Sequence, residues 1–454
     1  VLTTKEDVDT FQEVYGPCDT TLYGLTVSNI LTGNFGARTS VYYSTARPRG
    51  DFFVNVHDCA SLRLDGTPDG VTSSAAGSPT DAEKQNCEAA QIFNLDGLSG
   101  LKHIQGELRL ETNPKLTQVS VGLASLERID GDLILRDNDA LVGLDDGLSN
   151  LATLDGSLYV AGNMKLTSLL LGQLPAVGGD MAVISDNPAL SQIDLTGLTE
   201  LVTLNVTRND SLIDVSGFSN LESLSGSLQV NENSRLNDLK GLEKLTVVGG
   251  DVSINSNGEL TTLGLTVLQK IAGNLIVNGH PRLRAMDLPN LISVGGNVSL
   301  KGNASSSQMS LSGLESLSAV DGSLEISSNL RLFSVDGLSS LTSIGGDFVL
   351  DQNPSLPDLH GLLSLASVTG SLTAVNNNGL RDCSGLSTVL GWGSGASGVG
   401  GETTITNGIG CSSVDDVLSF SGDLAVRPDY CVTPGHVVLT TKEDVDTFQE
   451  VYGP

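Results

Sequence analysis

The sequence is poor in aromatic and in basic residues, and both shortages narrow what the protein can do. Phe, Trp and Tyr make up 4% of the 454 residues, with a single Trp, which excludes a broad aromatic core. Lys and Arg number 24 against 53 Asp and Glu, and the resulting net charge of -29 repels nucleic-acid phosphates and anionic lipid head groups. We therefore expect no nucleic-acid partner. The acidic excess is interpreted as a solvated surface, and calcium is the single cofactor that such a surface leaves open.

The chain also lacks the segments and motifs of membrane proteins and of enzymes. No apolar run reaches the roughly 20 residues that a transmembrane helix needs, so direct membrane insertion is not expected. HExxH, GxSxG, GxxxxGK[ST] and EF-hand sequences are all missing, and the histidines are scattered along the chain. These absences predict a non-catalytic protein. No Pro-rich or charge-rich linker divides the middle of the chain either, which favours one long unit whose repeats pack only on their neighbours.

The six cysteines lie outside the central part of the chain and show no CxxC spacing. Zinc ligands come in close pairs, so the spacing favours disulfides formed in an oxidising compartment and predicts an extracellular or cell-surface location. We predict the disulfides Cys59-Cys87 and Cys383-Cys411, one in each capping region. Cys431 would then bond the equivalent of Cys18 in a following unit. The alternative, that Cys18 closes its own cap with Cys59 or Cys87, is left open.

What the sequence has in abundance is a repeat of 22 to 26 residues. It reads G-x-L-x-I/V-x-x-N-x-x-L followed by G-L-x-x-L-x-x-I/V, and it recurs twelve times between Gly106 and Leu380. A fixed period in this range is typical of leucine-rich and related solenoids. The G-x-L-x-I stretch alternates apolar and polar residues, which is the pattern of a half-buried strand. These patterns predict a β-solenoid: a right-handed, leucine-rich parallel β-helix of about 12 or more rungs, with short capping helices and disulfide-stapled caps.

An Asn follows the first position of nearly every repeat by seven residues. Where the chain turns at the corner of a rung, backbone N-H and C=O groups are buried without strand partners. The side-chain amide of a stacked Asn can accept from the N-H and donate to the C=O. We interpret these residues as a structural ladder rather than a ligand site, with His280 replacing the amide in one rung. The predicted ladder consists of Asn113, Asn138, Asn163, Asn187, Asn209, Asn233, Asn257, Asn303, Asn329, Asn353 and Asn377.

The repeat beginning at Gly131, G-D-L-I-L-R-D-N-D-A-L-V-G-L-D-D-G-L-S-N-L-A-T-L, resembles the leucine-rich repeats of receptor L domains. These domains occur in the insulin and epidermal growth factor receptors, and fungal cell-wall proteins of the sporulation-specific type are similar. The resemblance covers about Gly24 to Trp392 and implies an extracellular, ligand-binding or cell-wall role. Receptor L domains have fewer rungs, and the accompanying cysteine-rich modules and kinase are missing, so a growth-factor-receptor role is not carried over.

The same seventeen letters, VLTTKEDVDTFQEVYGP, stand at Val1 to Pro17 and at Val438 to Pro454. Such a duplication is expected if the chain is one period of a tandem array followed by the start of the next. The segment carries a helix signal from Thr4 to Tyr15 that would cap the first rung. We divide the chain into an N-terminal cap with a long loop (1-105), regular repeats (106-390), a C-terminal cap and linker (391-437) and the start of the next unit (438-454).

Four Asn-x-Ser/Thr sequons complete the set of candidate sites. Asn209 and Asn303 belong to the predicted buried ladder, whereas Asn205 and Asn297 flank inward residues and should face water, so these two are the glycosylation candidates. Trp392 is expected to close the core of the last rung.

Two functions are compatible with these patterns. The first is a structural extracellular glycoprotein, one unit of a tandem array that assembles with copies of itself into a filament or surface appendage. The alternative is an adhesion or receptor ectodomain that binds another cell-surface protein or a glycan on its exposed sheet.

Overall fold

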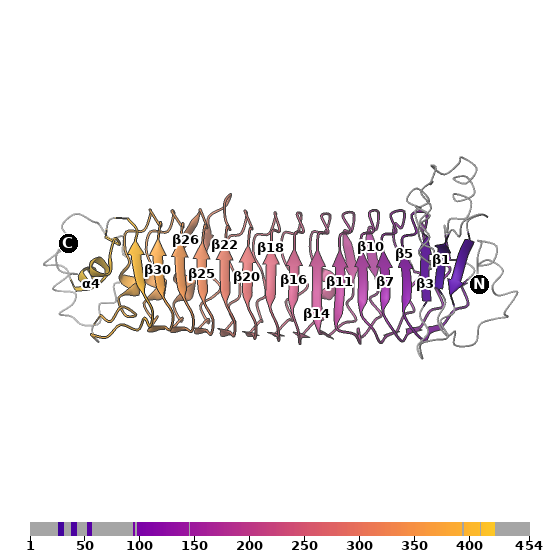
Figure 1. Ribbon diagram of the computed structural model, residues 1–454, viewed down its shortest axis with the longest axis horizontal. Coiled ribbons are helices and arrows are strands. Elements are labelled where there is room, and N and C mark those ends of the chain that lie inside the picture. Colours follow the sequence, from indigo (N-terminus) through magenta and orange to yellow (C-terminus); the bar gives the residue numbers. More distant parts are fainter. Residues whose placement is uncertain are drawn as a thin grey trace, which may run out of the picture.

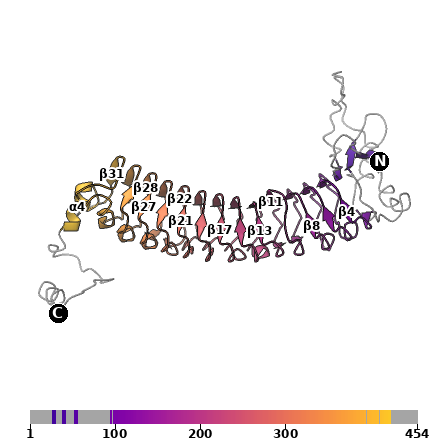
Figure 2. The same ribbon diagram turned by 90° about the horizontal axis from the view of Figure 1, so that it is seen from below.

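The chain folds as a parallel β-solenoid of about 11 turns with repeats of about 24 residues, which confirms the predicted fold class. The computed structural model describes residues 26-30, 38-42, 52-56, 94-95, 98-144, 146-392, 395-408 and 410-422. Successive rungs stack along one axis into a rod (Figure 1). The rod is bowed, and its widest sheet lies on the concave side (Figure 2).

The concave side is a sheet of 16 strands, each of four or five residues, to which every regular rung contributes one strand. All neighbours are parallel except β2, which runs antiparallel to β1 at the N-terminal edge. From that edge the strands are β2 (Arg38–Tyr42), β1 (Thr26–Ile30), β3 (Phe52–Val56), β5 (Leu108–Glu111), β7 (Leu133–Arg136), β9 (Leu158–Ala161), β11 (Met181–Ser185), β14 (Thr203–Thr207), β16 (Leu228–Asn231), β18 (Val252–Asn255), β20 (Leu275–Asn278), β22 (Val298–Lys301), β25 (Leu324–Ser327), β28 (Phe348–Asp351), β30 (Leu372–Val375) and β31 (Thr403–Thr406).

Two further faces close each rung, and both are built from shorter strands. One face carries a sheet of three strands, β4 (His103–Ile104), β6 (Arg128–Ile129) and β8 (Thr153–Leu154), and a sheet of eight, β13 (Glu200–Leu201), β15 (Ser223–Leu224), β17 (Val247–Val248), β19 (Lys270–Ile271), β21 (Ser293–Val294), β24 (Ala319–Val320), β27 (Ser343–Ile344) and β29 (Ser367–Val368). The other has the pairs β10 (Ser168–Leu170) with β12 (Gln192–Asp194) and β23 (Met309–Ser310) with β26 (Leu332–Ser334).

The core is a set of stacked aliphatic columns running the length of the rod. In β16, Leu228 and Val230 point inward and are fully buried, and the strand's other two residues face outward. The register keeps each column in line, because Leu228 pairs with Leu204 on one side and with Val252 on the other. Each buried side chain therefore contacts the aliphatic side chain at the same position in the rungs before and after it. Adding rungs lengthens the core without thickening it.

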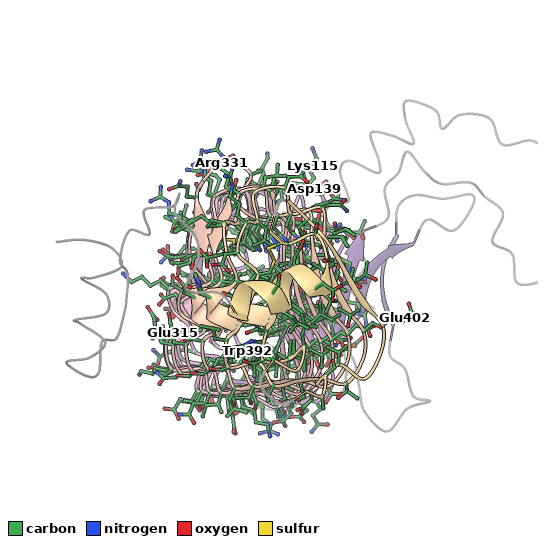
Figure 3. All side chains as sticks on the ribbon, turned by 90° about the vertical axis from the view of Figure 1, so that its left-hand side faces the viewer. Lys115, Asp139, Glu315, Arg331, Trp392 and Glu402 are labelled. Carbon is green, nitrogen blue, oxygen red and sulfur yellow. A yellow bond between two sulfur atoms is a disulfide. The ribbon has the colours of Figure 1, made fainter. Side chains whose placement is uncertain are left out.

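Helix is confined to short segments in the part of the chain that is described. Turns of 3₁₀ helix occur at η2 (Ser216–Phe218), η3 (Asp336–Leu338), η4 (His360–Leu362) and η5 (Ser384–Leu386). A single α-helix, α4 (Val414–Gly422), lies across the C-terminal end of the solenoid (Figures 1 and 3). Its Val417 is fully buried, and Val414 and Leu418 pack against the core, so α4 covers the apolar end of the last rung.

The caps agree only partly with expectation. A disulfide joins Cys383 to Cys411, the pair expected from the sequence, and ties the segment before α4 to the penultimate rungs. Trp392 does not close the core as predicted, because 52% of its surface is exposed, and α4 provides the cover instead (Figure 3). The predicted cap helix at Thr4 to Tyr15, the Cys59-Cys87 disulfide, Cys18 and Cys431 lie outside the described residues.

Candidate functional site

The most regular chemical feature of the molecule is the column of side chains at the corner that follows each strand of the concave sheet. Every predicted ladder Asn, and His280, is fully buried there. The backbone N-H of each donates to the side-chain acceptor of the next, over 2.9 to 3.2 Å, from Asn113 without interruption to Asn407. The amide Nδ2 donates in turn to a strand carbonyl of the preceding rung, as Asn233 does to Val206 O at 2.9 Å. The column therefore connects each rung to both of its neighbours.

Asn407 extends this column by one position that the sequence analysis missed. Its Oδ1 accepts from the N-H of Asn377 at 3.0 Å, and its Nδ2 donates to Ala374 O at 2.9 Å. The stretch from Gly400 to Asn407 keeps the seven-residue spacing between Gly and Asn but lacks the leucines of the repeat. Without those leucines the sequence pattern did not identify it as a rung.

The corner also requires an unusual backbone conformation, which the sequence pattern did not predict. From Asn113 to Asn377, the residue immediately before each corner side chain has a positive φ, between 54° and 59° at the nine non-glycine positions and between 62° and 74° at Gly162, Gly279 and Gly302. A left-handed conformation costs a non-glycine residue roughly 1-2 kcal/mol. The buried amides offset this repeated cost, because the sharp turn brings the backbone groups of two rungs within reach of one side chain.

His280 performs the same task with an imidazole. Its Nδ1 lies 3.2 Å from the backbone N of Asn257, and its Nε2 lies 2.9 Å from Ile254 O. The neutral tautomer with the proton on Nε2 reproduces the acceptor and donor of an amide. Burial lowers the pKa of His280, although the carbonyls of Ile254 and Asn257 oppose that shift.

We expect His280 to make the solenoid acid-sensitive. Unfolded chains take up a proton below the ordinary His pKa of about 6.5, whereas the folded form resists protonation, so stability is complete above that pH and declines as the pH falls below it. His280→Asn should remove this component. The measurement is the denaturation midpoint of the two proteins from pH 7.5 to 4.5, and parallel curves would contradict the assignment.

A second polar column, not foreseen, lines the glycine corner at the other end of each strand. The residue after the repeat glycine is Asp, Ser, Thr or Asn in most rungs, and its oxygen accepts the backbone N-H of the equivalent residue in the next rung. The chain Asp251 to Asn274, Asn274 to Asn297 and Asn297 to Ser323 has three such bonds of 2.7 Å. The recurrence of small polar residues directly after the glycine is the sequence signal that could have predicted it.

A third set of polar residues closes the turn before the G-L segment, and it accounts for part of the acidic excess. Asp214, Asp238, Asp358 and Asp382 each accept the backbone N-H two residues on, at 2.9 to 3.2 Å. His360 bridges two of these carboxylates, with its Nδ1 3.0 Å from Asp358 and its Nε2 3.5 Å from Asp382. Hydrogen bonding to Asp358, and then to Asp382, raises the pKa of His360 to about 10. These groups connect rungs on a half-exposed surface.

The four sequons occupy two kinds of position. Asn209 and Asn303 are fully buried in the corner column, where their side chains are hydrogen-bonded to adjacent rungs. Asn297 is exposed, and Asn205 is half-buried on the concave sheet with the Thr207 hydroxyl donating to its Oδ1 at 2.5 Å. An N-linked glycan at Asn297 leaves its Oδ1 free to accept from Ser323, so modification is compatible with the glycine-corner column.

We predict that a secreted preparation carries glycan at Asn297 and Asn205 and none at Asn209 or Asn303. Glycopeptide mass spectrometry after enzymatic release in heavy-oxygen water reports each position separately. The two buried sequons serve as internal controls, because a glycan there removes an amide from the corner column. Occupancy at Asn209 or Asn303 in folded protein would contradict the prediction.

The described residues hold no cluster of metal ligands. Among them, no group of three or more His, Cys, Asp or Glu side chains is placed to hold a metal ion. A shallow hollow of about 480 Å³ lies along the corner, open to solvent, where Arg208 pairs with Asp186 at 3.1 Å. Its lining residues are Met164, Asp186, Pro188, Arg208, Asp210, Glu232 and Ser256. No helix within the described ranges is long and apolar enough to cross a bilayer.

These features define the chain as a parallel β-solenoid whose rungs are joined by buried amides. No protein-family model matches the sequence, and no curated protein sequence is significantly similar to it.

Proposed function

We propose that this chain is one unit of a structural, non-catalytic extracellular glycoprotein, in which solenoid units follow one another in tandem and form a filament or surface appendage. The observation that carries the proposal is the identity of residues 1-17 with residues 438-454. A second unit beginning at residue 438 would repeat the whole rod. Its partners are copies of itself, and the resemblance to receptor L domains and fungal cell-wall proteins agrees with a cell-surface location.

The distribution of polar groups supports a mechanical role. Three sets of polar side chains form hydrogen bonds within and between rungs: the corner amides, the oxygens of the glycine corner and the turn carboxylates. Side chains that hold successive rungs together resist separation along the axis, which is the direction of load in a filament.

The alternative is an adhesion or receptor ectodomain, and one observation favours it. The outward side of the concave sheet from β14 to β22 carries mainly hydroxyl and amide side chains, such as Asn205, Gln229, Asn231 and Ser253. Such groups bind a neutral glycan or a polar protein surface by hydrogen bonding. On this hypothesis single units act alone and the concave sheet is the binding surface.

Two measurements separate these functions. Negative-stain images of native material should show fibres with an axial repeat equal to one unit, whereas isolated short rods would favour the ectodomain. Sequencing of the transcript beyond Pro454 should read CDTTLYGLTVSN, the letters that follow Pro17. An unrelated continuation would overturn the tandem array.

A further inference from the structure

Within the described residues, the last strand of the concave sheet, β31, has one unpaired edge. It pairs with β30 in parallel, and the N-H groups of Leu372 and Asn376 donate to the carbonyls of Glu402 and Thr406. Hydrogen-bonding groups alternate along a parallel strand, so the N-H and C=O groups of Thr403 and Ile405 point to the opposite side. Within the described part of the chain, no residue pairs with that side.

The described part of the C-terminal cap covers the core and forms no strand pairing with this edge. Helix α4 lies across the centre of the rod's end, whereas Glu402, the residue before β31, lies to one side of it (Figure 3). The edge also lacks the usual protection against pairing. Its sequence Thr-Thr-Ile-Thr has no charge and no proline, and Thr404 and Thr406 are exposed. Natural proteins shield such edges with lysine, proline or a covering segment, because an open edge recruits another strand.

The other edge of the same sheet is β2, at the opposite end of the rod. It runs antiparallel to the remaining strands, and its five residues Arg-Thr-Ser-Val-Tyr match the length that β31 needs. We propose that β31 of one unit pairs antiparallel with β2 of the next unit, so that the concave sheet continues across the junction between copies of this chain. This inference rests on the proposed tandem assembly and names the surface through which it occurs.

A matched pair of variants of the 454-residue chain tests the junction. Thr404→Lys with Thr406→Lys places two charges on the edge strand, facing outward. Thr373→Lys with Val375→Lys places the same charges one rung inside, because the register pairs Thr373 with Thr404 and Val375 with Thr406. Sedimentation velocity and negative-stain imaging over a concentration series report end-to-end association. We expect the edge variant to associate more than about tenfold more weakly than the natural chain, and the inner variant to associate normally.

Amide hydrogen exchange supplies a readout that folding defects do not mimic. The N-H groups of Thr403 and Ile405 should exchange fast in single units and slowly in assembled ones, while those of Thr404 and Thr406 stay slow in both. Slow exchange of Thr403 and Ile405 in single units would overturn the proposal, because the edge would then be covered by the chain itself.

Absence of association also overturns it, as does association that both variants leave unchanged. A filament of native material with rapidly exchanging edge amides would refute the strand pairing and leave the proposed tandem function intact. Isolated short rods in native material would instead refute the function.

Discussion

Asn233→Ala should cost about 3 kcal/mol or more, the largest single effect that we expect in this molecule. The substitution leaves the buried N-H of Asn209, which lies 2.9 Å from the Asn233 Oδ1, without a partner. It also removes one of the donors to the carbonyl of Val206, at 2.9 Å from the Asn233 Nδ2, and empties the volume that the amide fills. Each buried polar group left unpaired costs roughly 1-3 kcal/mol. Water has no route to either group, because the side chain is fully buried.

The matched control is Asn231→Ala, two residues earlier in the same rung. Asn231 stands on the outward side of β16, and its Oδ1 accepts from the Nδ2 of Asn255 at 2.9 Å. Its neighbours reach water, so we expect a loss below about 1 kcal/mol. Denaturant midpoints compare the variants, and amide exchange in β14 and β16 locates the damage, because a solenoid can open locally. Equal losses for the two variants would disprove a special role for the corner.

Much of this architecture could be predicted from the sequence because a solenoid repeats its physics at a fixed interval. An apolar pair such as Leu228 and Val230 states which side of a strand is buried, and its recurrence aligns the column. The Asn that recurs seven residues after the glycine likewise predicted the buried amide at the corner. It correctly predicted that Asn209 and Asn303 are buried, although both lie in sequons. Periodicity supplied what a single rung could not.

The sequence did not predict those features for which no particular residue type recurs from rung to rung. The left-handed residue before the corner is Thr112 in one rung, Arg208 in another and Gln352 in a third, so the backbone conformation recurs while the residue type does not. Trp392, the single Trp of the sequence, was expected to close the core of the last rung, but the apolar side of α4 covers that end. The sequence that covers an end of the solenoid is not repeated along the chain, so periodicity cannot identify it.

The polar columns also change how the acidic composition is interpreted. Asp251 accepts an inter-rung hydrogen bond, and Asp214 and Asp238 close turns, so these carboxylates have structural partners in addition to solvent. A solvated surface was the expectation from net charge alone. Some of the Asp side chains instead accept backbone hydrogen bonds at turns and between rungs. The net charge of this chain is therefore partly a consequence of its turn structure and is not evidence about binding partners alone.

Gly337→Ala should be the second most damaging substitution, at a cost of about 3 kcal/mol. Gly337 is buried in η3, and a methyl group there would lie 1.8 Å from the carbonyl oxygen of Leu311 in the preceding rung. That oxygen belongs to the backbone and cannot rotate away, so the two rungs must separate locally and lose contact in the core. A methyl group added to the equivalent glycines of other rungs, Gly217, Gly361 and Gly385, would likewise lie between 1.7 and 2.2 Å from a backbone oxygen.

Gly258→Ala provides the control for this effect. A methyl group there meets Ser234 O at 3.1 Å, a tight contact that a shift of a few tenths of an ångström relieves, and the residue does not have a left-handed backbone. We expect its free energy of unfolding, derived from the denaturant midpoint, to stay within about 0.5 kcal/mol of that of the natural chain, since a substitution without a severe backbone clash has little effect. If Gly337→Ala proved as mild as Gly258→Ala, the rungs would not be packed at the separation that the G-L turn implies. The leucine columns would then have to hold the rod without close backbone contact.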